Sequence, residues 1–284
     1  MTDCLRKVCP AGAVPGVAAL AGCMAVASLA AAAPAWAQGV TLRLQPEVGQ
    51  VYEYSLSIES VMNGVPGFPD APMQISVSEL SEVTAADENE FEATVTYEVA
   101  MDAAFGAEPE VPEAGAQSVR YSTRGEFLDR TDESVEFGGL VGMDGLAGSQ
   151  LAAVILPAGA VSVGDTWADS TSAPLPVVGG AEEIEFVRTF TLEAVEGDVA
   201  VIAVRSEFNE NVVIDAGGMP MTMAVQLASD GTARFDVARG LLLQMDAVTS
   251  NQMDMTVPGM GPLTVQVEGS MSVLLSGTSE AGGN

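Results

Sequence analysis

The sequence predicts an all-β protein in which two tandem-related antiparallel meanders form a half-barrel or a sandwich, with one short connecting helix. Three observations indicate this class. Apolar and polar residues alternate with a period of two in at least seven segments. Turn-forming residues separate these segments. The order of segments also repeats on either side of LPAGAVSVGDTW, residues 156–167, which we interpret as the hinge of an internal duplication.

The first half begins with two predicted strands. Residues 51–62 place tyrosine, leucine and isoleucine on one face and glutamate and serine on the other, as a half-buried strand does. The next strand begins in phase at Met73 and then shifts to Leu80 and Val83. That shift predicts a β-bulge near Ser78.

The remainder of the first half predicts a strand, a hairpin and a helix. Residues 90–102 alternate most regularly, and residues 118–131 predict a hairpin whose turn contains Gly125. Apolar residues then recur at helical spacing, which predicts a helix over about 145–155, ended by Pro157.

The second half contains five predicted strands. The first two are residues 181–194 and 200–208, joined by a turn at 196–198. Three longer strands follow, at about 219–227, 241–257 and 263–275. Their expected turns are Asp230-Gly231, Arg239-Gly240 and Pro258-Gly259.

These segments divide the chain into five parts. They are a signal peptide at 1–37, a first β-meander repeat at 38–137, a helical connector and hinge at 138–162, a second β-meander repeat at 163–277, and a disordered tail at 278–284. The repeats correspond in order, so that VGQVYEYS at 48–55 parallels VGDTWADS at 163–170. Each meander would bury one face by curling or by packing against its copy.

The first 37 residues have the pattern of a secretory signal peptide. Arg6 and Lys7 precede an alanine-rich apolar run, and residues 35–37, Ala-Trp-Ala, form a small-x-small cleavage signal. Two alternatives stay open: residues 20–23, Leu-Ala-Gly-Cys, form a lipobox that would anchor the protein by lipid at Cys23, or the run is retained as a membrane helix. We expect a periplasmic or secreted protein with no stable transmembrane anchor after processing.

Composition excludes several function classes. Loss of residues 1–37 removes Arg6, Lys7 and Asp3, which leaves 8 arginines, 38 acids and a net charge of −30. A surface this acidic repels nucleic acid and anionic lipid. The remaining chain has no His, Lys or Cys, which excludes Ser-His-Asp and Cys-His catalysis, histidine-bound zinc and lysine Schiff bases. We expect no cofactor.

Two short motifs carry a family resemblance. LP…V.VGDTW at 156–167, together with DGTARFDVARGLL at 230–242, resembles a family of uncharacterised exported bacterial proteins, a domain of unknown function that spans essentially the whole mature chain. The resemblance implies no activity. Its Gly, Asp and Trp positions fall on Gly164, Asp165 and Trp167, which we interpret as a turn, a side-chain cap and a plug for the end of a core.

Methionines and one arginine are the candidate ligand-binding residues. Thioethers could converge if the strands that carry them are neighbours, and such ligands select Cu(I); the residues concerned are Met219, Met221, Met223, Met253 and Met255. The alternative is that these methionines fill an apolar interior or line an adaptable pocket. Arg188 falls in the apolar row of Phe186 and Phe190, so its guanidinium needs an acidic partner, a ligand or an exit to water.

The acidic residues do not indicate an active site. Pairs of carboxylates at glycosidase spacing arise by chance among 38 acids, and the alternation places almost none of them on an inward face. Acidic turns such as 87–90 and 196–198 lack the spaced loop that binds Ca²⁺. We therefore expect a protein that is not an enzyme and has no metal site.

Two functions remain. The first hypothesis is a non-catalytic envelope protein that holds an apolar or lipid-like ligand on the concave face of a curved sheet. The alternative is a structural or assembly protein of the envelope that uses the same face against a protein partner. Methionine-based Cu(I) binding is the second alternative.

Overall fold

The computed structural model of the protein describes residues 39–64, 70–103, 116–130, 149–175, 182–215, 220–257 and 261–282. The chain divides into two compact units, Met1–Pro34 and Ala35–Asn284. The first unit, with most of the expected signal peptide, lies outside the described residues. In the described ranges, no helix has the length and apolar character needed to cross a membrane.

The described part of the second unit consists of eleven strands and one 3-10 turn, which confirms the all-β class. The first five strands are β1 (Gln50–Asn63), β2 (Ala71–Ala86), β3 (Glu90–Ala103), β4 (Ala116–Ser122) and β5 (Phe127–Arg130). The 3-10 turn is η3 (Gln150–Ala152). The other strands are β6 (Thr166–Leu175), β7 (Glu182–Glu196), β8 (Val199–Asp215), β9 (Pro220–Asp236), β10 (Leu241–Val257) and β11 (Gly261–Glu280).

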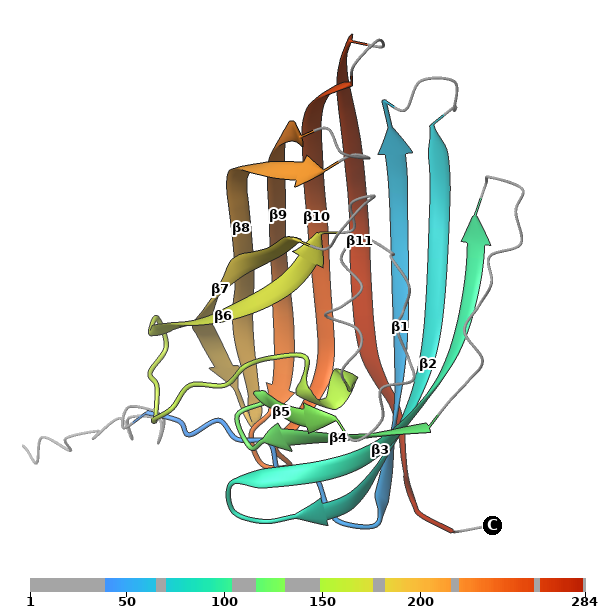
Figure 1. Cartoon of the computed structure of the whole chain (residues 1–284). Coiled ribbons are helices and arrows are strands. Elements are labelled where there is room, and N and C mark those ends of the chain that lie inside the picture. The colour runs from blue at the N-terminus through green and yellow to red at the C-terminus, as the bar shows by residue number, and fades with distance from the viewer. Residues whose placement is uncertain are drawn as a thin grey trace, which may run out of the picture. The chain divides into compact units, whose positions relative to one another are not determined.

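All eleven strands belong to one antiparallel sheet (Figure 1). Their order is β5-β4-β3-β2-β1-β11-β10-β9-β8-β7-β6. The first strand pairs with the last, so the two meanders join side by side through β1 and β11. Of the two expected arrangements the half-barrel is the one that fits, because a sandwich requires two stacked sheets. β11 continues to Glu280, into residues that the sequence assigns to a tail.

Alternation along the strands gives the sheet an apolar face and a polar face. One row of the apolar face crosses five strands through Leu56, Val273, Met245, Ala233 and Ile202. None of these five is more than 8% exposed. One residue further along, the corresponding row of the polar face is Ser57, Ser272, Asp246, Thr232 and Ala203.

Residues 149–161, which we call the strap, pack on the apolar face. Their apolar side chains are 0–5% exposed and join the sheet residues in one core; they are Leu151, Val154, Ile155 and Leu156. η3 lies within the strap and contacts β1 and β10. The N-terminal residues 39–48 run beside the strap, where Val40 and Val161 form a β-bridge.

The helix expected over 145–155 is much shorter in the structure. Within the described residues of that range only Gln150–Ala152 are helical, as a single 3-10 turn. Residues 153–156 have no regular structure, although Val154, Ile155 and Leu156 are buried. Contacts with the sheet determine the conformation of this segment, and the spacing of apolar residues along the sequence does not predict such contacts.

The β-bulge predicted near Ser78 is also wrong. β2 keeps regular register with β1 from Ala71 to Glu82, and its register with β3 shifts only between Val83 and Ala85. Leu80 therefore lies on the polar face and is 46% exposed. The strand keeps its phase because the polar residues at 79 and 81 find hydrogen-bond partners on the apolar face.

The turns of the second half are partly as expected. Gly240 lies in the turn between β9 and β10 with a positive φ of 64°, as predicted for Arg239-Gly240. The turn predicted at Asp230-Gly231 is wrong, because β9 runs straight through these residues. At Gly231 a Cβ atom would lie 2.7 Å from the Asp246 carbonyl oxygen, so the glycine allows close approach of β10. Pro258-Gly259 lies outside the described residues.

The hinge residues have the local roles that the sequence predicts. Gly164 has a φ of 95°, and its N–H donates to the Leu192 carbonyl at 2.7 Å. The Asp165 carboxylate accepts the Ser162 N–H at 2.8 Å. The Trp167 ring stacks on Phe190, and its Nε1 donates to the Ile155 carbonyl at 2.8 Å, which joins β6 to the strap.

Candidate ligand-binding face

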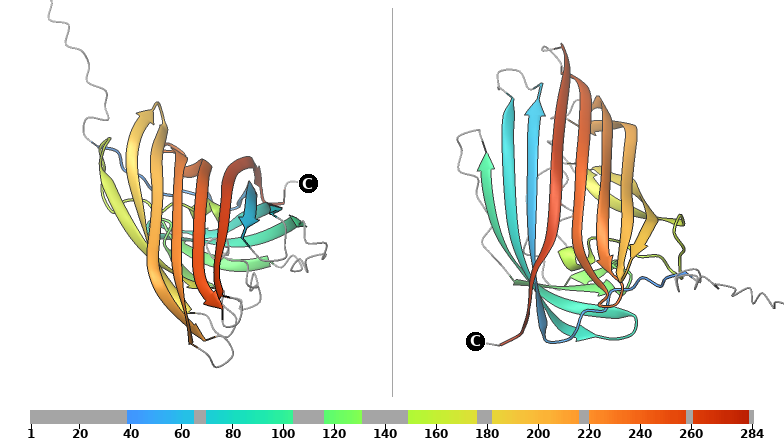
Figure 2. Two further views of the ribbon diagram at one scale, coloured as in Figure 1. Left: turned by 90° about the horizontal axis from the view of Figure 1, so that it is seen from above. Right: turned by 180° about the vertical axis from the view of Figure 1, so that it is seen from behind.

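The sheet divides near its β6 edge. β7 pairs with β8 as far as the Val187–Glu207 pair. Beyond that pair β8 continues to Asp215 against β9, and β7 continues to Glu182 against β6. The far half of the β6–β7 hairpin is thus separate from β8. It lies on the same side of the sheet as the strap, in front in Figure 1 and behind in the rear view of Figure 2.

A row of seven residues, six of them with polar side chains, crosses the apolar face at the level of this division. We call it the polar belt; its members lie opposite one another on neighbouring strands and are Ser60, Gly269, Thr249, Ser229, Ser206, Arg188 and Asp169. All seven are half-buried. The belt therefore offers hydroxyl groups and one ion pair within a surface that is otherwise apolar.

The polar belt separates two apolar zones. One zone is the core beneath the strap. The other is a smaller cluster that we call the apolar patch, made of Phe208, Val212, Met223 and Val225 with Leu227, Met253 and Met255 packed against them. A molecule on this face would therefore meet an apolar zone and a polar row side by side.

The structure brings three of the five predicted methionines together in the apolar patch. Met223 and Met255 lie opposite each other on β9 and β10, and Met253 lies opposite Val225. Met223 is 2% exposed, whereas Met253 and Met255 are half-buried. Met219 and the side chain of Met221 lie outside what the structure describes. The three thioethers have valine and phenylalanine neighbours, which is the environment of an apolar contact surface.

Arg188 lies in the polar belt at the point where the sheet divides, and its partner is Asp169 on β6. Nη2 donates to the Asp169 carboxylate at 2.9 Å, and the guanidinium carbon lies 5.8 Å from the Phe190 ring centroid. The two side chains are 29% and 25% exposed. The buried Nε has no hydrogen-bond partner among the described residues. Arg188 is thus paired through Nη2, and its guanidinium stays partly exposed at the edge of the patch.

Glu79 is a buried charged residue of this face that the sequence prediction missed. It is 1% exposed on the apolar face of β2. Its carboxylate accepts the Ser81 and Ser149 hydroxyl groups at 2.6 Å each, and the Gln150 N–H at 2.9 and 3.0 Å from its two oxygens. These donors attach the beginning of the strap to the sheet. Ser149 is also bound through its N–H to the Tyr121 hydroxyl at 2.6 Å.

Burial controls the ionisation of this cluster. It raises the pKa of the Glu79 carboxyl group, and the hydrogen bonds from Ser149, Ser81 and Gln150 oppose that shift. Burial also raises the pKa of the phenols that surround Glu79, with a further contribution from its negative charge; they are Tyr54, Tyr97 and Tyr121. The phenols therefore stay protonated, and Glu79 is the group whose charge changes with pH.

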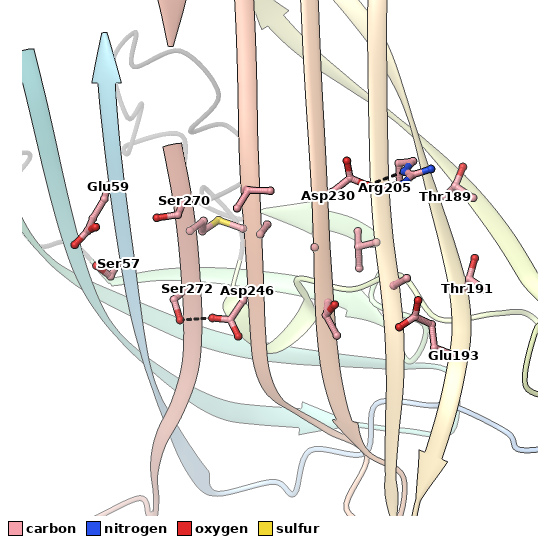
Figure 3. A pocket seen from close by; sticks show the side chains of 17 residues that line it. Ser57, Glu59, Thr189, Thr191, Glu193, Arg205, Asp230, Asp246, Ser270 and Ser272 are labelled. Carbon is pink, nitrogen blue, oxygen red and sulfur yellow. Dashed lines mark hydrogen bonds and ion pairs between the residues drawn. The ribbon is translucent and has the colours of Figure 1, made fainter. Parts of the chain in front are cut away.

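The polar face contains a hollow of about 970 Å³ with a different chemistry (Figure 3). Its lining spans β1, β11, β10, β9, β8 and β7, and its charged members are Glu59, Glu193, Asp230, Asp246 and Arg205. Arg205 is bound to Asp230 at 2.6 Å, and Ser272 donates to Asp246 at 2.7 Å. In the described residues no group of three or more His, Cys, Asp or Glu side chains is placed to hold a metal ion.

Residues 149–242 match the model of a family of unknown function (DUF6263). No curated protein matches the chain. A structure of lipovitellin, titled for its lipid–protein interactions, has a TM-score of 0.43 and 12% identity over 84% of this chain, which spans only 26% of that protein. Salmonella typhi OmpF in complex with daunomycin has a TM-score of 0.29 and 9% identity, over 79% of this chain and 97% of that one. Likenesses this weak carry no argument about function. The family match confirms, for residues 149–242, the resemblance to a domain of unknown function.

Proposed function

We propose that the protein is a non-catalytic, exported binding protein for an amphiphilic, lipid-like ligand. The hydrocarbon part lies on the apolar patch, and the polar head lies at the polar belt beside Arg188. The observation that carries the proposal is the belt itself, a half-buried polar row on an apolar face, next to the place where β7 separates from β8.

The side chains of the patch suit such a ligand. Met253 and Met255 are half-buried, and the unbranched methionine side chain adapts to ligands of irregular shape. The four hydroxyl groups of the belt and the partly exposed guanidinium of Arg188 provide hydrogen-bond donors for a head group. A wholly apolar molecule would leave these groups unpaired, which costs about 1–3 kcal/mol for each one that is buried.

A catalytic role fits less well. Glu79 is the only acid among the buried residues of the described part, and its oxygens are occupied by Ser81, Ser149 and Gln150. A general acid or base must reach its substrate. Since Glu79 lies beneath the strap and holds it, we assign the residue to structure.

A fluorescence titration with the apolar probe N-phenyl-1-naphthylamine tests the proposal. Met255→Asn places an amide on the apolar patch and should weaken probe binding by about tenfold, because one apolar contact is lost and one polar group is desolvated. Thr256→Asn is the matched control on the opposite face of β10 and should bind as the parent does. Equal affinity of the two variants would contradict the proposal, and so would a parent protein that binds no probe.

The belt requires a second titration, in which lauric acid displaces the probe. Ser206→Ala combined with Ser229→Ala removes two hydroxyl groups from the belt and should weaken lauric acid by about tenfold, at roughly 1 kcal/mol for each hydrogen bond. Affinity for the probe, which has no carboxylate, should change little. The control is Ser270→Ala combined with Ser272→Ala on the polar face. An equal loss in both pairs of variants would contradict a head-group site at the belt.

A further inference from the structure

We propose that the strap, residues 149–161, is an internal occupant of the apolar face that detaches to admit ligand. This inference rests on the proposed function, because it concerns the regulation of the same face. The strap covers the apolar zone on one side of the polar belt, and the apolar patch forms the zone on the other side. Displacement of the strap would double the number of apolar zones that a bound molecule can reach.

The buried side chains of the strap are chemically equivalent to the hydrocarbon of a ligand. Leu151, Val154, Ile155 and Leu156 lie against residues of the sheet in a single core. They make this contact from a segment that, apart from η3 and the bridge at Val161, has no regular secondary structure. The free energy lost when these side chains leave is therefore replaced by similar contacts when hydrocarbon enters.

Detachment of the strap leaves the sheet intact. The strand ladders contain no strap residue, and the strap is held by separate contacts. Leu156 exchanges two hydrogen bonds with Arg124, at 2.8 Å through its N–H and 3.0 Å through its carbonyl. Ile155 accepts one from Trp167, and Arg43 donates to the Pro157 and Ala158 carbonyls. Opening of the strap would therefore break these contacts without breaking a strand ladder.

The Glu79 contact makes the attachment weaker than an apolar contact would be. Glu79 is removed from water, and the donors on the strap replace its hydration only in part, since burial of an ionisable group costs free energy that its partners must offset. When the strap detaches, water returns to the carboxylate. Isoleucine or valine at this position, as the alternation would otherwise predict, would hold the strap more firmly.

A reversible disulfide tests whether the strap must move. The Ser81 and Ser149 hydroxyl oxygens are 2.7 Å apart, so cysteines at these positions bring two sulfur atoms within reach of a bond. The chain has cysteines only at 4, 9 and 23. We would replace those three with serine and introduce Ser81→Cys and Ser149→Cys together, with each single cysteine variant as a control.

The measurement is titration with N-phenyl-1-naphthylamine in the oxidised and reduced states. The oxidised double variant should bind the probe at least about tenfold more weakly than the reduced form, since the tether leaves the probe only the apolar patch and removes the contacts that it would make beneath the strap. The single variants should not respond to reduction. Equal affinity in both states would overturn the inference while the proposed function stands.

Hydrogen exchange on the unmodified protein separates the two claims and does not depend on the variant's folding. The amides of Gln150 and Leu156, which bond to Glu79 and Arg124, should exchange at least about tenfold faster than the amide of Ile202 in β8. Equal rates would show that the strap opens only with the whole fold, which overturns the inference. If the parent binds no probe but the strap amides exchange faster, the proposed function fails and strap opening survives.

Discussion

Glu79 and Arg188 are charged residues that lie in apolar rows of the sheet. A charge is tolerated there only where other groups replace its hydration. Glu79 receives hydroxyl groups and one N–H, and Arg188 has the Asp169 carboxylate and the face of Phe190. Each charge thus marks a contact between two segments, β2 with the strap for Glu79 and β7 with the edge strand β6 for Arg188.

The pKa shift of Glu79 predicts a pH dependence of stability. Burial raises its pKa in the folded state above the value of 4.5 in the unfolded chain. The folded state thus binds the proton more tightly, and this contribution to stability is fully present below pH 4.5 and is lost as the pH rises through the folded pKa. Glu79→Gln removes the titrating group.

Thermal melts at a series of pH values measure this effect. The melting temperature of Glu79→Gln relative to the parent should increase as the pH rises above about 4.5 and become constant once Glu79 is ionised. The titratable groups near Glu79 are the phenols of Tyr54, Tyr97 and Tyr121, whose raised pKa values lie far above this range, and the Arg130 guanidinium lies beyond them. Glu82→Gln on the polar face of β2 is the control. A difference that does not vary with pH would contradict the assignment.

The ion pair of Arg188 and Asp169 should contribute to stability. A double-mutant cycle with Arg188→Ala and Asp169→Ala should give a coupling free energy of about 1 kcal/mol, less than for a fully buried pair because both side chains are partly solvated. The comparison is the same cycle for Arg205 and Asp230, another cross-strand pair whose side chains are 64% and 58% exposed. Coupling no larger than in that exposed pair would contradict a structural role for Arg188.

At the residue scale, the sequence predicts the surroundings of Arg188 better than those of Glu79. Arg188 shares the phase of Phe190, which indicates that its guanidinium needs a partner. That partner lies on β6, and the sequence does not specify which strand β6 pairs with. Glu79 escapes the prediction because the bulge expected near Ser78 would turn Leu80 inward and leave Glu79 on the polar face. The signal was present, since Val77 and Val83 share the odd-numbered phase of Glu79 and both are buried.

At the scale of elements, the β4–β5 hairpin and the strap fit closely at Gly125. This glycine has a φ of 88°, and a Cβ atom there would lie 2.7 Å from the Val154 carbonyl oxygen. The neighbouring Arg124 exchanges hydrogen bonds with Leu156. The turn thus serves two purposes, reversal of the chain and close approach of the strap.

Gly125→Ala should therefore destabilise the protein more than an alanine at an open turn. Gly197 has a similar positive φ of 64° but no atom within 4 Å of its would-be Cβ. Gly197→Ala should cost about 1 kcal/mol from backbone strain alone, and Gly125→Ala should cost at least about 1 kcal/mol more, because the strap must shift. Urea unfolding measures both. Equal costs would contradict close packing of the strap on this turn.

Secondary-structure elements are predictable where the alternation of apolar and polar residues within the element determines its conformation. The strands that the sequence predicts, the hairpin at Gly125 and the turn at Gly240 follow from local patterns, and the structure confirms them. The strand β6, Thr166–Leu175, is not among the predicted strands. The sequence predicts a helix over about 145–155, which includes the beginning of the strap, because Leu151, Val154 and Ile155 recur at helical spacing. Those side chains are buried by the sheet instead, and Ser149 caps only a single 3-10 turn. Contacts with residues distant in sequence therefore determine the conformation of this segment.

At the scale of the molecule, β1 pairs with β11 and so joins the two meanders side by side. In the sequence, the strap region connects the first meander to the second. The pairing covers Gln50–Glu280 at one end and Asn63–Gln266 at the other. One core includes residues of both meanders, among them Tyr54, Phe91, Phe190 and Phe235. The Tyr54 hydroxyl donates to the Leu242 carbonyl at 2.9 Å across this core. Neither meander therefore completes a core alone.

The protein should unfold in one transition despite its two meanders. Circular dichroism in the far ultraviolet and the fluorescence of Trp167, which lies between β6 and the strap, should give superimposable urea curves. Trp36→Phe is needed so that fluorescence reports on Trp167 alone, since these are the two tryptophans of the chain. Two separated transitions would show that the meanders fold independently.

The arrangement of strands was less predictable than the strands themselves. Alternation identifies which residues share a face, but every strand pair with a given phase looks equally suitable. The β1–β11 pair, the separation of β7 from β8 and hence the polar belt all depend on non-local register. Three of the five candidate methionines meet because β9 and β10 are neighbours, which the turn at Gly240 made predictable.

Methionine footprinting tests the central claim, that the apolar face binds the ligand, most directly. Met253 and Met255 are half-buried and should be oxidised by hydrogen peroxide in the free protein, whereas Met245 in the core, at 8% exposed, should react slowly. With saturating N-phenyl-1-naphthylamine, mass spectrometry should show slower oxidation of Met253 and Met255 and no change at Met245. Unchanged oxidation of Met253 and Met255 in the presence of bound probe would contradict the claim.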